Sequence, residues 1–162
     1  MVLNLFGGGD ESMYFDEFTV GYVYTTDSYL VSKEEIIAFA SRYDPQDNHM
    51  NEQKEKNGPF KGIIASGLLT LGIATKLGIK LRSMTENFIC GVGCDDVRFL
   101  QPVYPSDMLT AHIEVVECTP HSPKNDRGFV SFLYKIKNQR GKVVLTFRLT
   151  GLHERDQSLL HA

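Results

Sequence analysis

The chain has 162 residues, of which 42% are apolar and 23% are charged, and its formal net charge at neutral pH is −3. These values are typical of a soluble protein of one domain, long enough to bury a core without disulfide or metal staples. The acidic balance excludes the basic footprint of a nucleic-acid-binding protein, and the most apolar stretch, residues 63–79, is too short and too mixed for a membrane span.

An arm, a strand and a capped helix are expected first along the chain. Residues 1–13 contain three consecutive glycines and are expected to form a flexible N-terminal arm. Residues 22–31 are rich in Tyr, Val and Thr, which predicts a strand. Ser32 then begins a helix with a Ser-x-x-Glu capping pattern, and Pro45 ends that helix at Asp44 because the residue before a proline disfavours helical geometry.

A polar loop and a long apolar helix follow. Residues 44–62 contain several Gly and Pro breakers, which predicts a loop with one helical turn at 51–56. Residues 63–81 carry apolar side chains nearly all round a helix, which predicts burial on most sides. In a chain of this size, such a helix must be enclosed by the remaining elements.

Alternating apolar residues predict that a sheet supplies this enclosure. Segments 107–118, 129–137 and 143–151 alternate apolar and polar side chains, which is typical of an antiparallel sheet with one wet face. Residues 88–100 are also predicted to form a strand, but their apolar phase switches from even to odd positions, which predicts a β-bulge near Asp95. The expected fold is α+β, with one antiparallel sheet wrapped around one long helix.

With these elements in view, the chain resembles the MaoC-like dehydratases and (R)-specific enoyl-CoA hydratases. The resemblance covers roughly residues 14–153 and implies that they form a single hotdog domain, with 154–162 as a C-terminal tail. Three features carry it: Asp44-x-x-x-x-His49, the stretch Gly62-Ile-Ile-Ala-Ser-Gly67-Leu, and VRFLQPVYPSDMLT at 97–110.

The resemblance implies roles for four residues, and the position of Ser66 before the helix suggests one for a fifth. Asp44 and His49 match an acid and a histidine that act on one water, and Gly67 matches a glycine whose N–H binds the thioester carbonyl. Thr75 is the nearest candidate for a hydroxyl found inside the helix of some hydratases, and Ser66 either caps the helix or contacts substrate.

The loop between the acid and the histidine departs from the family pattern. That pattern usually reads Asp-x-Asn-Pro-x-His, whereas this chain has Pro45-Gln46-Asp47-Asn48 between the two residues. From turn chemistry alone, Asp44-Pro45 is a helix stop followed by a turn, and Gly67 is a packing glycine.

The chemistry that the resemblance implies is the addition of water to a 2-enoyl thioester, giving a (R)-3-hydroxyacyl thioester, or the reverse. It needs a base, a proton for the α-carbon and a donor for the enolate oxygen, and we expect no metal or redox cofactor. The substrate would be an acyl-CoA or acyl-carrier thioester of fatty acid metabolism. Two alternatives remain open: a hotdog acyl-CoA thioesterase, and a non-catalytic module that binds acyl thioesters.

Cysteine content and sheet edges suggest location and assembly. Cys90, Cys94 and Cys118 form an odd set without metal-ligand spacing, which favours free thiols in a cytoplasmic protein. Cys90 and Cys94, four apart on a predicted strand, are expected to lie buried on one face. Open sheet edges and the resemblance imply a homodimer or higher homo-oligomer with sites at the interface, and no nucleic-acid or membrane partner is expected.

Overall fold

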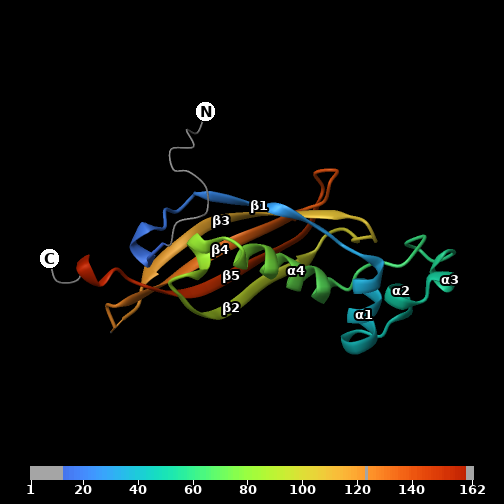
Figure 1. Ribbon diagram of the computed structural model, residues 1–162, viewed down its shortest axis with the longest axis horizontal. Helices are drawn as coiled ribbons and strands as arrows, with labels where there is room; N and C mark the ends of the chain where they lie inside the picture. Colours follow the sequence, from blue (N-terminus) through green and yellow to red (C-terminus); the bar gives the residue numbers. More distant parts are fainter. Residues whose placement is uncertain (1–12, 123, 160–162) are drawn as a thin grey trace.

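A computed structural model describes residues 13–122 and 124–159 as one antiparallel sheet with a long helix across one face (Figure 1). The sheet has the strand order β1-β3-β4-β5-β2, which confirms the α+β class. Its strands are β1 (Val23–Leu30), β2 (Phe88–Phe99), β3 (Met108–Pro120), β4 (Arg127–Lys137) and β5 (Val143–Glu154).

The helix α4 (Gly67–Ile79) packs against β1 and β3, and three shorter helices gather at one end of the molecule (Figure 1). Those three are α1 (Lys33–Tyr43), α2 (Asp47–Met50) and α3 (Glu52–Glu55). One further turn of helix, α5 (Arg82–Thr85), follows α4, and single 3-10 turns form at Phe15–Glu17 and Gln157–Leu159.

The core is built from the apolar side chains that alternate with polar ones along the strands. Leu109, Ala111, Ile113 and Val115 of β3 are fully buried, as their period of two predicts. The corresponding residues of β4 are buried as well, and the hairpin to β5 turns at Gly141, which has a φ of +72°. The predicted helix-covered face is therefore confirmed.

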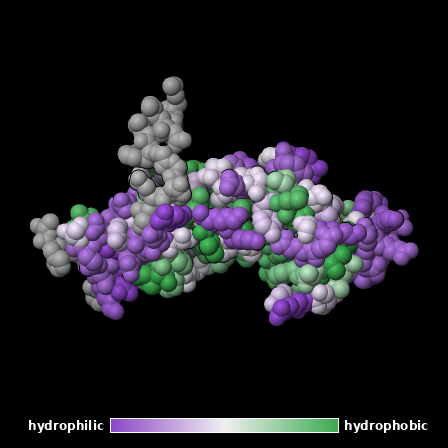
Figure 2. Space-filling view, in the orientation of Figure 1, coloured by the Kyte–Doolittle hydropathy of each residue, from purple (hydrophilic) through white to green (hydrophobic). Residues whose placement is uncertain are grey.

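The helix α4 begins later than the apolar run that predicted it. Residues 63–66 belong to no helix or strand, and the Ala65 N–H donates to the Val103 carbonyl. Within α4 the inner side is buried, but Leu68 and Ile79 are 55% and 61% exposed, so the predicted burial on most sides is wrong for a single chain. The face that carries α4 shows apolar patches at its middle and polar surface at both ends (Figure 2).

The pairing of β2 with β5 is irregular. The register shifts between Asp95 and Arg98, where Asp96 has a φ of +52°, and this confirms the predicted bulge near Asp95. Two further shifts, between Phe88 and Cys90 and between residues 91 and 93, were not predicted.

These shifts correct the expectation for two cysteines. Cys90 pairs with Leu152 and Cys94 with Leu149, and these partners lie three residues apart on a regular strand. The two thiols therefore face opposite sides of β2, since an extra residue in a bulge reverses the alternation. Both are free and exposed, so the prediction of a shared, buried face is wrong.

The domain boundaries drawn from the sequence stay predictions. Residues 1–12 and 160–162 lie outside the described residues, so most of the predicted arm and the end of the predicted tail do too. Among the helices of residues 13–122 and 124–159, none combines the length and the apolarity needed to cross a bilayer.

Candidate active site

The polar loop brings Asp44 and His49 together. Asp44 is the C-cap of α1, and Gln46 is the N-cap of α2, the turn that carries His49. The Nε2 atom of His49 lies 3.3 Å from Oδ2 of Asp44, with the two side chains 7% and 20% exposed. The sequence predicted a loop here and not the turn α2, because four mostly polar residues are too few to show a helical period. This turn directs the imidazole inward.

The backbone determines which nitrogen of His49 faces the acid. Nδ1 lies 2.8 Å from the carbonyl oxygen of Ile64, and a carbonyl can only accept, so Nδ1 carries a hydrogen. In the neutral imidazole Nε2 is then an acceptor, and it faces Oδ2 of Asp44, which is another acceptor. One water, with two O–H bonds, can donate to both atoms at once.

Two side chains hold Asp44 in its ionised form. The Ser66 hydroxyl donates to Oδ2 at 2.6 Å, and the Gln46 amide donates to Oδ1 at 2.7 Å. The hydrogen bond from Ser66, followed by that from Gln46, lowers the pKa of Asp44 below its ordinary value. Asp44 is therefore a carboxylate at neutral pH, and it orients the groups that donate hydrogen bonds to it.

Ser66 links the acid to the helix. Its hydroxyl accepts from the Leu68 N–H at 3.3 Å as the N-cap of α4 and donates to Asp44, and the residue is 1% exposed. From the sequence, Ser66 could either cap the helix or contact substrate. Its hydrogen bond to Asp44 was not predicted. Twenty-two residues separate the two side chains, and no local pattern spans that distance.

Gly67 is the first residue of α4, at the positive end of the helix dipole. No acceptor is paired with its N–H among the residues that the structure describes, as is usual for a first-turn amide. A Cβ at this position would lie 2.7 Å from the ring of Phe99, so the ring occupies the place that a side chain at 67 would take. The N–H is thus available to an oxygen of a ligand.

A cavity of about 280 Å³ lies beside His49 and Gly67. Its buried walls include Ile64, Val103 and Val144, while Phe99 and Leu100 form part of its exposed side. An apolar cavity with a few convergent polar groups is typical of a small-molecule site, and this one has the size of a short acyl group.

Thr75 is placed away from these groups. Eight residues separate it from Gly67, or about 12 Å along α4, and its hydroxyl donates to the Leu71 carbonyl at 3.0 Å. The hydroxyl-bearing residue that lines the cavity is instead Thr70, which is 3% exposed and donates to the Ser66 carbonyl. Thr70 could have been selected from the sequence as the hydroxyl residue that lies one helical turn after the cap Ser66.

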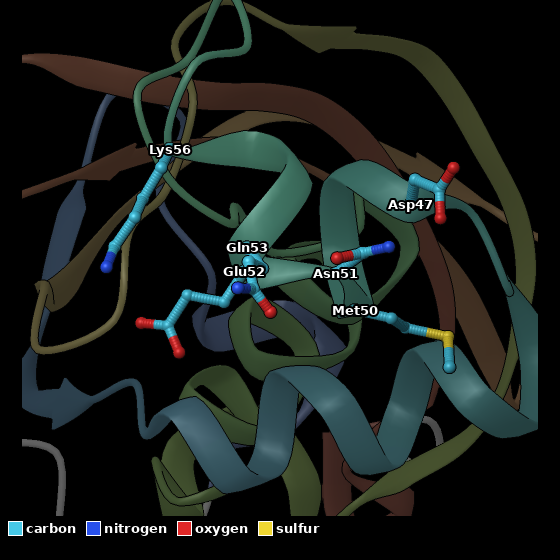
Figure 3. Close-up of a pocket in the computed structure, with 6 residues that line it drawn as sticks. All are labelled: Asp47, Met50, Asn51, Glu52, Gln53 and Lys56. Atoms are coloured by element: carbon cyan, nitrogen blue, oxygen red, sulfur yellow. The ribbon is translucent and has the colours of Figure 1, made fainter.

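A second hollow, of about 630 Å³, lies over α2 and α3 (Figure 3). It is polar, and two of its carboxylates are paired, Asp47 with Lys54 and Glu52 with Lys33. Neither Asp44 nor His49 lines it, so the candidate active site is at the smaller cavity. The hollow is lined by Asp47, Met50, Asn51, Glu52, Gln53 and Lys56.

Comparison with known proteins identifies relatives of this chain. A family model described as a MaoC like domain matches residues 17–130. The uncharacterized protein YdeM of Bacillus subtilis strain 168 is 39% identical over 143 residues, covering 88% of this chain and 100% of that protein. The crystal structure of a MaoC-like dehydratase from Rhodospirillum rubrum is 27% identical, with a TM-score of 0.82 over 90% of this chain and 99% of that one.

A more distant structure identifies the architecture. A Mycobacterium tuberculosis protein with a double hotdog fold is 18% identical, with a TM-score of 0.71 over 90% of this chain and 45% of that one. The sheet with α4 across one face is therefore the hotdog fold that the sequence led us to expect.

Proposed function

The chain belongs to the MaoC-like family, and from this premise we propose that it adds water to a 2-enoyl thioester or removes water from a 3-hydroxyacyl thioester. The observation that carries the proposal is the pair of facing acceptors, Nε2 of His49 and Oδ2 of Asp44, 3.3 Å apart next to an apolar cavity. The resemblance adds the (R) configuration and a coenzyme A or carrier-protein thioester.

In the hydration direction, one water donates to both members of the pair. Imidazole is the stronger base of the two side-chain types, so His49 takes a proton at Nε2 while Asp44 keeps the water oriented. The water oxygen bonds to the β-carbon of the substrate, and the double-bond electrons move toward the carbonyl oxygen. The proton on His49 then passes to the α-carbon, which completes the addition, and dehydration is the same path reversed.

The Gly67 N–H stabilises the charge that forms between these steps. It lies at the start of α4 and lines the same cavity as His49, so an enolate oxygen can accept from it. One oxyanion donor of this kind is worth about 3–4 kcal/mol of barrier height. The proposed path uses no metal or redox cofactor, and coenzyme A enters as part of the substrate.

We also propose that the protein is a homodimer paired through β2. This strand is at an edge of the sheet, and its side chains Phe88, Ile89 and Val92 are 38%, 40% and 52% exposed. An exposed, apolar edge strand is a template for another strand, and pairing with a second copy satisfies it. The cytoplasmic location expected from the cysteines stays a prediction.

An assay with crotonyl-CoA and longer 2-enoyl-CoA analogues tests the proposal and separates it from the alternatives. Hydration removes the absorbance of the conjugated enoyl thioester without releasing a thiol, and this is the expected result. Release of free coenzyme A would instead identify a thioesterase. Tight acyl-CoA binding without turnover at any chain length would identify a binding module.

A further inference from the structure

The loop residue Gln46 is hydrogen-bonded to both members of the proposed catalytic pair. Its side-chain amide donates to Oδ1 of Asp44 at 2.7 Å, and its carbonyl oxygen accepts from the N–H of His49 at 3.1 Å. A carboxylate oxygen can only accept, so the NH2 group of the amide faces Asp44. Gln46 is also one of the positions at which this loop departs from the family pattern, which has Asn there.

We propose that Gln46 is a positioning residue that fixes the plane of the Asp44 carboxylate, so that Oδ2 stays directed at Nε2 of His49. This inference rests on the proposed function, in which these two atoms hold the reacting water. Gln46 does not line the cavity beside His49, so it acts through Asp44 and not on the acyl group.

Two hydrogen bonds are needed to fix this carboxylate. The torsion that turns an aspartate carboxyl group about its Cβ–Cγ bond has broad minima, so a single hydrogen bond leaves the group free to rock. Ser66 donates at 2.6 Å to Oδ2, the oxygen that faces His49. Gln46 donates to the other oxygen, so the two donors together define the plane of the carboxylate.

The main chain holds Gln46 where its side chain reaches Asp44. Its N–H donates to the Asp44 carbonyl at 2.7 Å, which closes a three-residue turn about Pro45, whose ring fixes φ. Gln46 is the N-cap of α2, but its side chain makes no cap hydrogen bond, so the amide is available to Asp44. These bonds join residues 44–49 of one chain, so they do not depend on pairing at β2.

The charge on Asp44 gives a second way to observe this contact. Ser66 contributes most to the lowered pKa of Asp44, and the amide of Gln46 contributes next. Loss of the amide should therefore change this pKa as well as the rate. A side chain that only filled space in the loop would change neither.

Gln53 supplies a matched control. It is another exposed glutamine, on α3, and it lines the polar hollow over α2 and α3 (Figure 3). Within the described part of the chain, its side-chain amide takes part in no hydrogen bond. Gln53→Met therefore removes the same chemical group from a neighbouring helix and leaves the donors to Asp44 in place.

The first measurement is steady-state hydration of crotonyl-CoA by full-length variants whose folding is checked by circular dichroism. Gln46→Met keeps a side chain of similar length without a donor, and it is expected to lower kcat about tenfold with little change in KM. Gln46→Glu replaces the donor by a second carboxylate and should lower kcat at least as much, and it serves if Gln46→Met does not fold. Gln53→Met is expected to match the wild type.

The second measurement is the pKa of Asp44 in the same variants, by NMR titration of its side-chain carboxyl carbon, whose signal is assigned by its absence from Asp44→Asn. Gln46→Met should raise this pKa, because a donor to the ionised form is lost. Gln46→Glu should raise it further, because a like charge is added beside the carboxylate. Gln53→Met should leave it at the wild-type value.

The outcomes distinguish the role of Gln46 from the proposed function. A wild type that hydrates crotonyl-CoA, with Gln46→Met equal to it in kcat or in the pKa of Asp44, would overturn the role of Gln46. A fall in kcat shared with Gln53→Met, or a change in KM alone, would overturn it too. A wild type that hydrates no 2-enoyl-CoA would instead contradict the proposed function itself, whatever the pKa of Asp44 in the variants.

Discussion

At the scale of single residues, the acid of the site depends on a serine far from it in sequence. Ser66 is the largest contributor to the lowered pKa of Asp44, and the same hydroxyl caps α4. Its removal should therefore affect both the acid and the helix. The two effects can be separated, because Ser32 caps α1 by accepting from the Glu35 N–H and has no part in the site.

We predict that Ser66→Ala raises the pKa of Asp44, because the variant lacks the hydrogen bond that contributes most to the ionised carboxyl. NMR titration of the side-chain carboxyl carbon of Asp44 measures this pKa directly. Loss of the cap should also lower the free energy of unfolding by about 1 kcal/mol.

The control is Ser32→Ala, which should show a similar loss of stability by urea unfolding and a wild-type pKa of Asp44. An unchanged pKa of Asp44 in Ser66→Ala would refute the link between Ser66 and Asp44. Equal shifts in both serine variants would show that the effect comes from stability alone.

Some residues of the candidate site could be predicted from the sequence, and others could not. The five-residue spacing of Asp44 and His49 was visible because both lie in one loop, and the structure places them 3.3 Å apart. The bond from Ser66 and the position of Thr70 at the cavity depend on how α4 docks on the sheet, which no local pattern encodes. For the same reason Thr75, selected by sequence position, turned out to bond the Leu71 carbonyl within its own helix.

At the scale of elements, the strands were predictable because a period of two is a strong signal, and the short helices were not. The turn α2 has four residues, too few for any helical period. The start of α4 was misplaced because residues 63–65 are apolar and buried yet not helical, and an apolar run alone does not show where a helix begins. The cap at Ser66 was the local signal that marked the true boundary.

The two edge strands, β1 and β2, give a test of assembly. We predict that Val92→Lys, on the exposed apolar part of β2, converts the proposed homodimer to a monomer, because a buried lysine at a strand-pairing edge is unfavourable. Light scattering coupled to size-exclusion chromatography measures the mass directly.

Leu30→Lys is the matched control, since Leu30 is 57% exposed on β1 at the opposite edge. It should leave the dimer intact. A dimer that survives Val92→Lys but not Leu30→Lys would place the interface on β1, and a monomeric wild type would refute the dimer altogether.

At the scale of the whole molecule, a buried histidine lies far from the candidate site, near the other end of strand β5. His153 lies on β5 nine residues beyond Val144 of the cavity, or about 30 Å along the strand. It is 1% exposed, its ring contacts those of Phe18, Phe88 and Phe132, and neither ring nitrogen has a hydrogen-bond partner in the described part of the chain. No sequence pattern singles out His153, because the burial of a residue near a strand end depends on what packs over it.

His153 should make the protein less stable in mild acid. Burial lowers the pKa of His153 from 6.5 to about 4, so the unfolded chain binds a proton that the native chain excludes. Stability is then highest above pH 6.5 and falls as the pH drops toward 4, by about 2 kcal/mol between pH 7 and pH 5. Urea unfolding at the two pH values measures the change.

His153→Leu should remove most of this pH dependence, whereas His112→Leu, at a half-buried position on the wet face of β3, should leave most of it in place. If the stability of His153→Leu still fell by the same amount between pH 7 and pH 5, groups other than His153 would be responsible.

The most direct test of the account is kcat/KM for crotonyl-CoA hydration by Asp44→Asn, His49→Ala and the double variant, each confirmed to be folded. Because both residues are assigned to one water, each single variant should lose about a thousandfold or more, and the double variant should be no worse than the poorer single one. A single variant that stays within about tenfold of the wild type would contradict the claim that Asp44 and His49 activate this water.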